Sequence, residues 1–458
     1  MAGEWREVTV EEIKAESENA LATGPFGSSI GSRFFTDSGV PVIRGGNLSE
    51  DIGTRLNDEG LVFLYPDKAR EFSSSTVHDG DLVFTCWGTV NQVGLVDRRA
   101  AHREYIISNK QMKLTPDTAK ADSLFLYYLF SSPGLQHRIK NQSIGSSVPG
   151  FNLGQLRAMR IRVPEVKEQR AIAHILGTLD DKIELNRRMS DTLEAMAQAI
   201  FKSWFVDFQP VRAKAQGRDL GLPKEIADLF PDRFEDSELG EIPAGWGVST
   251  LGDALSVLET GGRPKGGVRD IAEGAPSVGA ESIVRLGRFD YSKTKFVPRE
   301  FFDSMRKGHV HDGDVLLYKD GGRPGEFEPH VTVVGDGFPF YEFCINEHVY
   351  RLRSEPGLPQ AYLYFWLSSD SVMEEMRNRG TGVAIPGLNS TAVRALSVLR
   401  PSSGVLGAFA SNVQPMVRAV FARCNASRTL GALRDTLLPK LICGELRVKD
   451  AERVTEVA

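Results

Sequence analysis

Side chains that can contact duplex DNA recur in the glycine-rich loops of this chain. Arg and Lys can bind phosphates or guanine, whereas Asn and Gln can form hydrogen bonds with the edge of adenine. The candidates are Arg44, Asn47, Asn91, Gln92, Lys110, Gln111, Ser146 and Ser147 in the first half, and Arg263, Lys265, Arg269, Lys319 and Arg323 in the second. Since a surface side chain in such a loop is usually only solvated, solvation is the alternative for each residue taken singly.

Motifs for catalysis and metal binding are weak by comparison. A methyltransferase would need a tetrapeptide of the Asn-Pro-Pro-Tyr type and an ATPase a GxxxxGK[ST] loop, and the chain contains neither motif. Glu165 and Lys167 form an ExK pair, but the pair opens a predicted helix and no Pro-Asp precedes it. His309 and His311 alone are too few to indicate a metal, and no CxxC pair is present. We therefore predict no catalytic and no metal-binding residue; an enzyme with an unrecognised site is the alternative.

The composition is that of an ordinary globular protein. A chain of 458 residues is expected to form two to four domains, at roughly 100–200 residues per domain. The net charge of −5 argues weakly against a protein that coats nucleic acid by bulk charge, although a local basic face can still exist. Isolated cysteines, no signal peptide and no apolar run of about 20 residues predict a cytoplasmic protein without a membrane segment.

Residues 164–208 form the longest periodic segment. Apolar residues recur every three or four positions and charged residues fill the other faces, which predicts an amphipathic helix. A helix of about 40 residues is roughly 60 Å long, too long to be buried in one small domain. We therefore expect it to pack on a partner helix of the same chain. The residues predicted at this helix or subunit interface are Ile172, Leu176, Leu179, Ile183, Leu193, Met196 and Ile200, with Leu430, Leu433 and Leu437 on the partner.

The partner emerges from an internal repeat. YLYFWLSS (362–369) lies on FLYYLFSS (125–132), a shift of 362 − 125 = 237 residues. The same shift lays GVAIPGLN (382–389) on GSSVPGFN (145–152) and VRALSVLRP (393–401) on LRAMRIRVP (156–164). Upstream the match continues with small gaps, so that PVIRGGNL (41–48) lies near PSVGAESI (276–283) and Trp5 matches Trp246. The repeat indicates two tandem domains, each followed by a long helix.

The repeated segments indicate particular elements. Residues 123–140 are predicted to form one helix, and the second long helix is expected at about Val405–Leu441, with Pro415 favouring a kink or a late start. The loop tips differ between the halves: TCWGTVNQVG follows GDLVF in the first, and YKDGGRPGEFEPH follows GDVLL in the second. A shared framework with different loops is expected if each half reads a different DNA sequence.

Several segments together resemble the specificity subunits of type I restriction–modification systems. EQRAIAHIL (168–176), LDDKIELN (179–186) and WFVDF (204–208) resemble their central conserved region. FPDRFEDSELGEIPAGW (230–246) resembles the start of their second half, and LRDTLLPKLICGELRV (433–448) their C-terminal signature, with Cys443 where serine is usual. The resemblance covers nearly the whole chain.

The resemblance implies an α+β fold. Two tandem target-recognition domains, each a curved mixed β-sheet with helices, would be joined by two long helices that form an antiparallel coiled coil with pseudo-two-fold symmetry. The implied segments are 1–163 and 245–400 for the two domains, 164–208 and 401–458 for the helices and tail, and 209–244 for the connector.

The resemblance also implies a non-catalytic DNA-binding subunit. Each half would read one part of a bipartite, asymmetric site in double-stranded DNA, and the helices would set the spacer between the parts. The chain would bind no cofactor itself. It would recruit two methyltransferase subunits that use S-adenosylmethionine, and restriction/translocase subunits that use ATP and Mg. A duplicated scaffold that pairs proteins without touching DNA is a further alternative.

Overall fold

The structure is a computed structural model that describes residues 5–90, 92–143, 150–219, 221–321, 325–380, 382 and 386–456. The chain divides into two compact units. Unit 1 comprises Met1–Glu184 and Arg428–Ala458, and unit 2 comprises Leu185–Ser427. The predicted domain borders follow chain order, whereas the compact units divide both long helices between them.

Unit 1 is built on two open sheets and one strand pair. The antiparallel sheet has the order β2-β10-β7-β8, and the mixed sheet has the order β3-β5-β4-β9-β6, in which β4 and β9 are parallel. Strands β1 and β11 pair where the chain enters and leaves the domain. The strands are β1 Arg6–Thr9, β2 Leu21–Thr23, β3 Phe35–Thr36, β4 Val40–Ile43, β5 Val62–Leu64, β6 Thr76–His78, β7 Leu82–Thr85, β8 Val93–Leu95, β9 Glu104–Ile107, β10 Gln111–Leu114 and β11 Arg160–Val163.

Short helices complete unit 1. They are α1 Val10–Ile13, α2 Pro66–Arg70, α3 Ser123–Ser131, α4 Pro133–Gln142, α5 Leu153–Ala158 and the C-terminal α15 Val448–Glu456. Helix α3 is apolar around most of its circumference and its residues 125–130 are buried, as expected of a core helix. The single helix predicted over 123–140 is wrong: Ser132 is extended and α4 starts at Pro133, because the residue before a proline disfavours helical dihedral angles.

Unit 2 repeats this framework. Its antiparallel sheet has the order β15-β23-β20-β21, β14 pairs with β24, and β16 pairs in parallel with β22 in the sheet β19-β16-β22. The strands are β12 Phe234–Ser237, β13 Gly240–Pro243, β14 Gly247–Thr250, β15 Leu255–Thr260, β16 Ala275–Val278, β17 Ile283–Arg285, β18 Arg288–Phe289, β19 Lys295–Val297, β20 Val315–Tyr318, β21 Val331–Val333, β22 Cys344–Ile345, β23 Val349–Ser354 and β24 Ser397–Arg400. The helices are α7 Gln209–Ala215, α8 Lys224–Ala227, α9 Leu251–Ala254, α10 Arg299–Ser304, α11 Gln360–Leu367, α12 Asp370–Arg379 and α13 Ser390–Arg394.

Matched residues perform matched structural roles in the two units, which confirms the predicted duplication. The Asn152 side chain accepts a hydrogen bond from the backbone of Gln155 and caps α5, and Asn389 caps α13 in the same way through Ala392. Strand pair β1–β11 of unit 1 corresponds to β14–β24 of unit 2. The same sequence signals therefore produce the same local structure twice.

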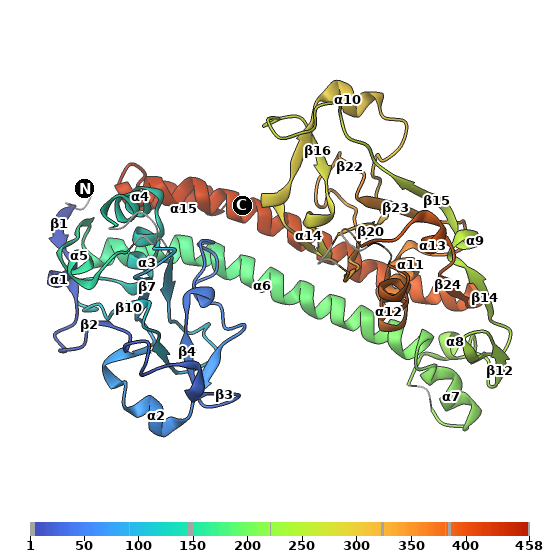
Figure 1. The fold of residues 1–458 in the computed structure, drawn as a ribbon, viewed down its shortest axis with the longest axis horizontal. Helices are drawn as coiled ribbons and strands as arrows, with labels where there is room; N and C mark the ends of the chain where they lie inside the picture. The colour runs from blue at the N-terminus through green and yellow to red at the C-terminus, as the bar shows by residue number, and fades with distance from the viewer. Residues whose placement is uncertain are drawn as a thin grey trace. The chain divides into compact units, whose positions relative to one another are not determined.

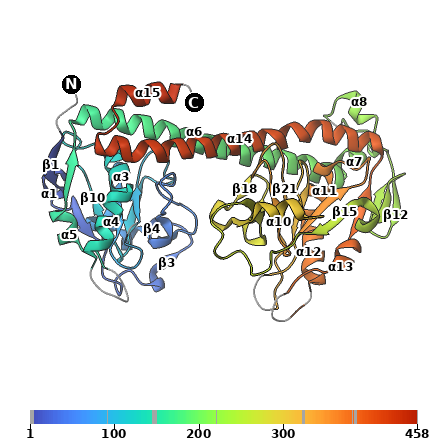
Figure 2. The ribbon, with the colours of Figure 1, turned by 90° about the horizontal axis from the view of Figure 1, so that it is seen from above.

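The two long helices are α6, Val166–Phe205, and α14, Ser403–Cys443. Within each unit their segments run side by side, and the strands of the unit lie on one side of them (Figures 1 and 2). Helix α14 continues through Pro415 without a break, so the predicted late start is wrong. In unit 1, Asp180 of α6 contacts Arg434 of α14. In unit 2, Phe205 of α6 contacts Phe409 of α14. The second contact thus lies 205 − 180 = 25 residues later in α6 but 434 − 409 = 25 residues earlier in α14. The pairing is therefore antiparallel, as predicted.

The connector is more ordered than a linker. The sequence predicts one short helix there, whereas the structure contains α7, α8 and the antiparallel hairpin β12–β13. Val211, Phe230 and Ile242 are buried in the core of unit 2. Apolar side chains spaced along a Pro- and Gly-rich segment thus anchor it to the domain.

Candidate nucleic-acid interface

A cavity of about 600 Å³ in unit 1 gathers several of the predicted DNA-binding side chains. Its walls come from the loop after β2, the turn η2 (Gly45–Asn47), the loop after β7 and the turn between β9 and β10. Each wall segment is joined to a strand, so the two sheets fix its ends. Arg44, Gln92, Lys110 and Gln111 all line this cavity.

Arg44 and Lys110 are exposed cations at the rim of the cavity. The Arg44 Nη2 donates a hydrogen bond to the Gly60 carbonyl at 3.1 Å, and its guanidinium carbon lies 5.9 Å from the centre of the Phe35 ring. Within the described part of the chain, neither cation forms an ion pair. Their positive charge is therefore available to a phosphate.

Asn47 and Gln92 use their amides inside the protein. Asn47 is buried: its Oδ1 accepts from the Arg44 backbone N–H, and its Nδ2 donates to the carbonyls of Asn57 and Glu59 at 2.9 and 3.1 Å. Gln92 is half-buried and donates to the Leu48 carbonyl at 2.9 Å. The geometry of Asn47 does not fit the predicted DNA contact, because both N–H groups of its amide already hold the turn.

Gln111 lies at the floor of the cavity and is 0% exposed. Its Oε1 accepts a hydrogen bond from the Ser108 hydroxyl, while its Nε2 has no acceptor among the described residues. A buried donor without a partner costs roughly 1–3 kcal/mol. Gln111 is therefore a polar group that the folded chain leaves unsatisfied.

Trp87 is a cavity residue that the sequence analysis did not single out. The residue is 52% exposed and lies two positions after the end of β7, in the loop that differs between the halves. The ring packs on Gly150, where a Cβ would clash with the indole. An aromatic side chain next to glycine-rich loops was the available signal, and its position opposite Gly150 could not be read from the sequence.

Four predicted DNA-binding residues, Asn91, Ser146, Ser147 and Arg323, lie outside the described residues. Lys265 and Arg269 of unit 2 are exposed on the loop after β15. Neither takes part in an ion pair within the described ranges.

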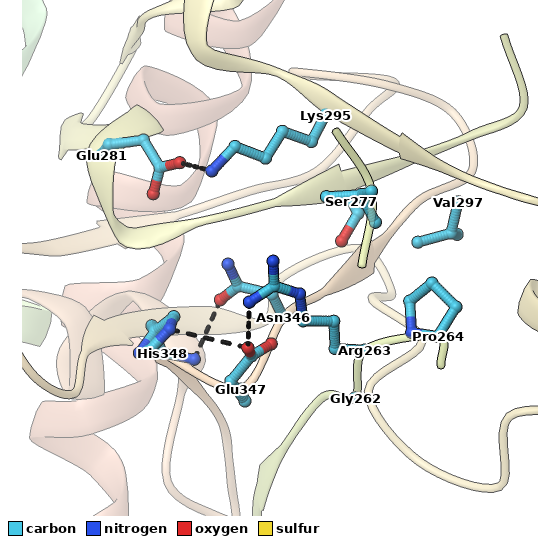
Figure 3. Close-up of a pocket in the computed structure, with 11 residues that line it drawn as sticks. Gly262, Arg263, Pro264, Ser277, Glu281, Lys295, Val297, Asn346, Glu347 and His348 are labelled. Atoms are coloured by element: carbon cyan, nitrogen blue, oxygen red, sulfur yellow. Dashed lines mark hydrogen bonds and ion pairs between the residues drawn. The ribbon is translucent and has the colours of Figure 1, made fainter. Parts of the chain in front are cut away.

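The corresponding cavity of unit 2 measures only about 80 Å³ and is crossed by ion pairs (Figure 3). Arg263 Nη1 lies 3.6 Å from Glu347 Oε1, and Lys295 Nζ donates to Glu281 Oε1 at 2.7 Å. Burial alone would raise the pKa of Glu281, but the hydrogen bond and charge of Lys295, a backbone hydrogen bond and the nearby His348 together hold that pKa below its ordinary value. The charges that line this cavity therefore neutralise one another.

Lys319 is likewise engaged within unit 2. Its Nζ donates to the Glu347 carbonyl at 3.3 Å and lies 3.5 Å from the Asp320 carboxylate. Asp320 also contacts His348. Of the predicted cations in the described part of unit 2, Arg263 and Lys319 are thus partly neutralised, in contrast to Arg44 and Lys110.

The residues predicted at the helix interface separate into two groups. Those of unit 1 lie in or against its main core, and so do two of the three in unit 2. Buried or partly buried are Ile172, Leu176, Leu179, Ile183, Leu430, Leu433 and Leu437 in unit 1, and Leu193 and Ile200 in unit 2. Met196 is the exception, since it is 48% exposed and does not pack between the helices.

Within the described residues, no group of three or more His, Cys, Asp or Glu side chains is placed to hold a metal ion. His309, one half of the HxH pair, packs against Phe302 and contacts the Met305 carbonyl. A search of the same residues for a helix both long and apolar enough to cross a membrane finds none.

Known proteins resemble the chain in both sequence and fold. Residues 32–195 match the family described as type I restriction modification DNA specificity domain. The type I restriction enzyme MjaIX specificity subunit of Methanocaldococcus jannaschii is 28% identical over 72% of this chain and 70% of the relative. The HindI specificity subunit of Haemophilus influenzae is 24% identical over 75% of this chain and 81% of the relative.

A solved structure shares the fold. The type I restriction–modification S subunit from M. genitalium aligns with a TM-score of 0.57 at 15% identity, over 96% of each chain. The duplicated domains, the paired long helices and the names of the sequence relatives thus all point to the same class of protein. Residues 32–195 thus match a type I restriction modification DNA specificity domain, and much of the chain is similar in sequence to type I specificity subunits.

Proposed function

We propose that the chain is the DNA-recognition subunit of a type I restriction–modification complex. Each domain reads one part of a bipartite, asymmetric site in double-stranded DNA. The role is binding and positioning, and the chemistry belongs to partner subunits. The names of the relatives, all specificity subunits, agree with this role.

One observation carries the proposal: a single sheet framework occurs twice, with different side chains at the same position. In unit 1 the cavity beside the parallel strand pair carries Arg44 and Lys110, which form no ion pair within the described chain. In unit 2 that place holds the Arg263–Glu347 and Lys295–Glu281 pairs. Domains that recognised identical half-sites would be expected to repeat their loops as well as their sheets.

The DNA-binding residues proposed for direct contact are those that the framework exposes. They are Arg44, Lys110, Lys265 and Arg269, with Gln92 and Arg263 at the cavity walls and Lys319 beside Glu347. Exposed Arg and Lys supply phosphate contacts, and the loop tips supply base contacts. Asn91, Ser146, Ser147 and Arg323 remain part of the proposal from sequence alone.

Helices α6 and α14 are proposed to set the spacer between the two parts of the site. A helix of 40 residues is about 60 Å long, at about 1.5 Å per residue. Inserting or deleting one helical turn in 181–200 should change the spacer length or abolish binding. Both half-site sequences should remain unchanged.

Part of α6 also offers a surface for another subunit. Leu185, Met189 and Met196 are exposed apolar side chains, and their spacing of four and seven residues places them on one helix face. We propose that this face contacts one of two methyltransferase subunits, so that Met196 belongs to a subunit interface rather than to the helix pair. The methyltransferase subunits would bind S-adenosylmethionine, and restriction subunits would bind ATP and Mg in the cytoplasm.

The decisive experiment maps methylated adenines in a host that expresses the chain with its methyltransferase partner. A two-part motif with a fixed gap is expected. A continuous palindrome, or no motif, would contradict the proposal. Salt-sensitive retention of the assembled complex on duplex DNA separates DNA recognition from a scaffold that only pairs proteins.

A domain exchange tests the independence of the halves. Replacing residues 1–160 by the equivalent segment of another family member should change one part of the motif and leave the other part and the gap intact. If both parts changed, the two domains would not read DNA independently.

A further inference from the structure

We propose that the cavity of unit 1 receives one nucleobase turned out of the DNA duplex, with the Trp87 indole at its rim and the Gln111 amide at its floor. This inference rests on the proposed function, because it concerns how the first domain reads its part of the site. It assigns an extrahelical base as the ligand of the unit 1 cavity, which is much larger than the corresponding cavity described in unit 2.

The depth of Gln111 is the first argument. Gln111 lines the cavity yet is 0% exposed, so it cannot reach the edge of a base that stays stacked in the duplex. Its Oε1 is occupied by the Ser108 hydroxyl and its Nε2 has no acceptor in the described chain. An acceptor atom on a base would satisfy that donor, either a carbonyl oxygen of thymine, cytosine or guanine or a ring nitrogen of adenine. The floor therefore offers a hydrogen-bond donor to a base that enters the cavity.

The walls leave room for such a base. The volume of about 600 Å³ lies in the range of about 300–1,000 Å³ that is typical of small-molecule sites. Gly45 and Gly46 form a wall without side chains: a Cβ at Gly46 would meet nothing within 4 Å, and one at Gly45 would lie 3.9 Å from Gln111 Nε2. A flat ring can therefore approach Gln111 along this wall.

Trp87 supplies an aromatic surface at the entrance. One side of its indole is held against Gly150, and 52% of the residue stays exposed. Aromatic side chains bind single bases by stacking with little dependence on sequence. A fixed, half-exposed indole can stack on the extruded base or fill the gap that the base leaves.

The rim charges fit the strand on either side of an extruded base. Arg44 and Lys110 form no ion pair within the described chain and can bind the flanking phosphates. In unit 2, Asp320 stands where Trp87 stands in unit 1. The backbone of Asp320 forms an isolated β-bridge with Gly387, as the backbone of Trp87 does with Gly150. With a cavity of about 80 Å³ and a carboxylate at that position, unit 2 is expected to read its half-site without an extruded base.

The test uses the complex with its methyltransferase partner and duplexes that carry the mapped site. A single mismatch is placed at each position of both half-sites, the methylated adenines excluded, since the methyltransferase itself extrudes those. We expect one position in the half-site of the first domain where the mismatch tightens binding by about tenfold, because an unpaired base is easier to extrude. No position in the other half-site should behave in this way.

Variants assign the effect to the cavity. Trp87→Ala should abolish the gain from the mismatch, Trp87→Phe should retain most of it, and Gln111→Leu should reduce it if the variant folds. Tyr341→Ala is the matched control, because Tyr341 is an exposed aromatic residue of unit 2 that lines neither cavity. Sequence-specific binding without any position that a mismatch favours, or a gain that survives Trp87→Ala, would overturn the inference. Loss of sequence-specific binding by the unmodified complex would instead overturn the proposed function.

Discussion

The cavity of unit 1 and the cavity of unit 2 occupy the same place in one repeated framework, yet their chemistry is opposite. Counting from the parallel strand pairs, Val42 corresponds to Ser277, so Gly46 corresponds to Glu281. A bare wall in unit 1 is thus replaced by a carboxylate that binds Lys295 in unit 2. The sheets tolerate this exchange because Gly46 and Glu281 each stand in a short turn that follows a strand, outside the strand pairings.

The helix pairs show a second contrast. In unit 1, Asp180 of α6 and Arg434 of α14 form a buried ion pair at 2.8 Å, and the Tyr128 hydroxyl donates to the same carboxylate. In unit 2, Phe409 of α14 packs against Phe201 and Phe205 of α6, with ring centres 6.0 and 5.1 Å apart. One helix crossing is specified by charge and the other by aromatic shape.

The largest effect is expected from Arg434→Met, which leaves the Asp180 carboxylate buried without its partner. Breaking one side of a buried pair costs about 3–5 kcal/mol. Urea unfolding should show this loss. The double variant Asp180→Leu/Arg434→Met should recover most of the lost free energy of unfolding, because two apolar side chains leave no charge uncompensated. A double variant as unstable as the single one would show that the helix crossing of unit 1 does not depend on this ion pair.

Phe409→Ala tests the aromatic crossing of unit 2. Truncating a fully buried phenylalanine costs about 3–5 kcal/mol through lost burial and a residual cavity. This loss should not depend on pH between 5 and 8, because the substitution removes no ionisable group. Phe409→Leu is the control and should cost clearly less, since it keeps most of the volume.

A middle-sized effect is expected at the cavity rims. Arg44→Ala/Lys110→Ala should reduce the dependence of log affinity on log salt by about two, near 0.9 per lost phosphate contact, and weaken binding about tenfold. Arg263→Ala should have a smaller effect, because Glu347 already neutralises part of its charge. Salt titrations of the assembled complex measure the slope of log affinity against log salt for both variants. Equal slopes would contradict the proposed difference in charge between the two cavities.

The smallest effect is a difference in pH dependence between two carboxylates of α6. Burial alone would raise the pKa of Asp181, but Arg99, Arg55 and Arg98 together outweigh it and lower that pKa. Burial raises the pKa of Glu194 despite Arg285. Asp181 therefore stabilises unit 1 above pH 3.8, and this contribution is lost as pH falls through its lowered pKa. Glu194 favours the folded state below pH 4.5, and this contribution is lost as pH rises through its raised pKa.

Neutral replacements reveal these opposite signs. At pH 7, Asp181→Asn should destabilise the protein by about 1 kcal/mol or less, whereas Glu194→Gln should be neutral or stabilising. The difference for Glu194→Gln should shrink toward pH 4, whereas the difference for Asp181→Asn should be lost only as pH falls below 3.8. Melting temperatures measured from pH 4 to 7 provide the test, and the same sign for both variants at pH 7 would refute the assignment.

The framework was predictable because its signals are local and occur twice. Asn152 and Asn389 each cap a short helix in the same way, and the helical period of residues 164–208 predicts α6. Residue chemistry at the site was less predictable. Asn47 and Arg44 stand three residues apart in one loop, yet the first is buried by its hydrogen bonds and the second is exposed. Only the fold reveals which amide is consumed by a turn, that Gln111 is buried, and that Glu347 faces Arg263.

The start of each domain lies close to the end of a long helix, which bears on how the order of segments along the chain could be changed. Trp246 opens the second domain and packs on Phe205 at the end of α6, while Trp5 opens the first domain and contacts Gly444 just after α14. Each domain thus begins beside the end of a long helix. The second domain is joined to α6 through the connector, whereas the first domain lies beside the end of α14 without a covalent link to it. A circularly permuted chain, joined from residue 446 to residue 5 and opened within 217–222, should preserve every strand pairing of both domains.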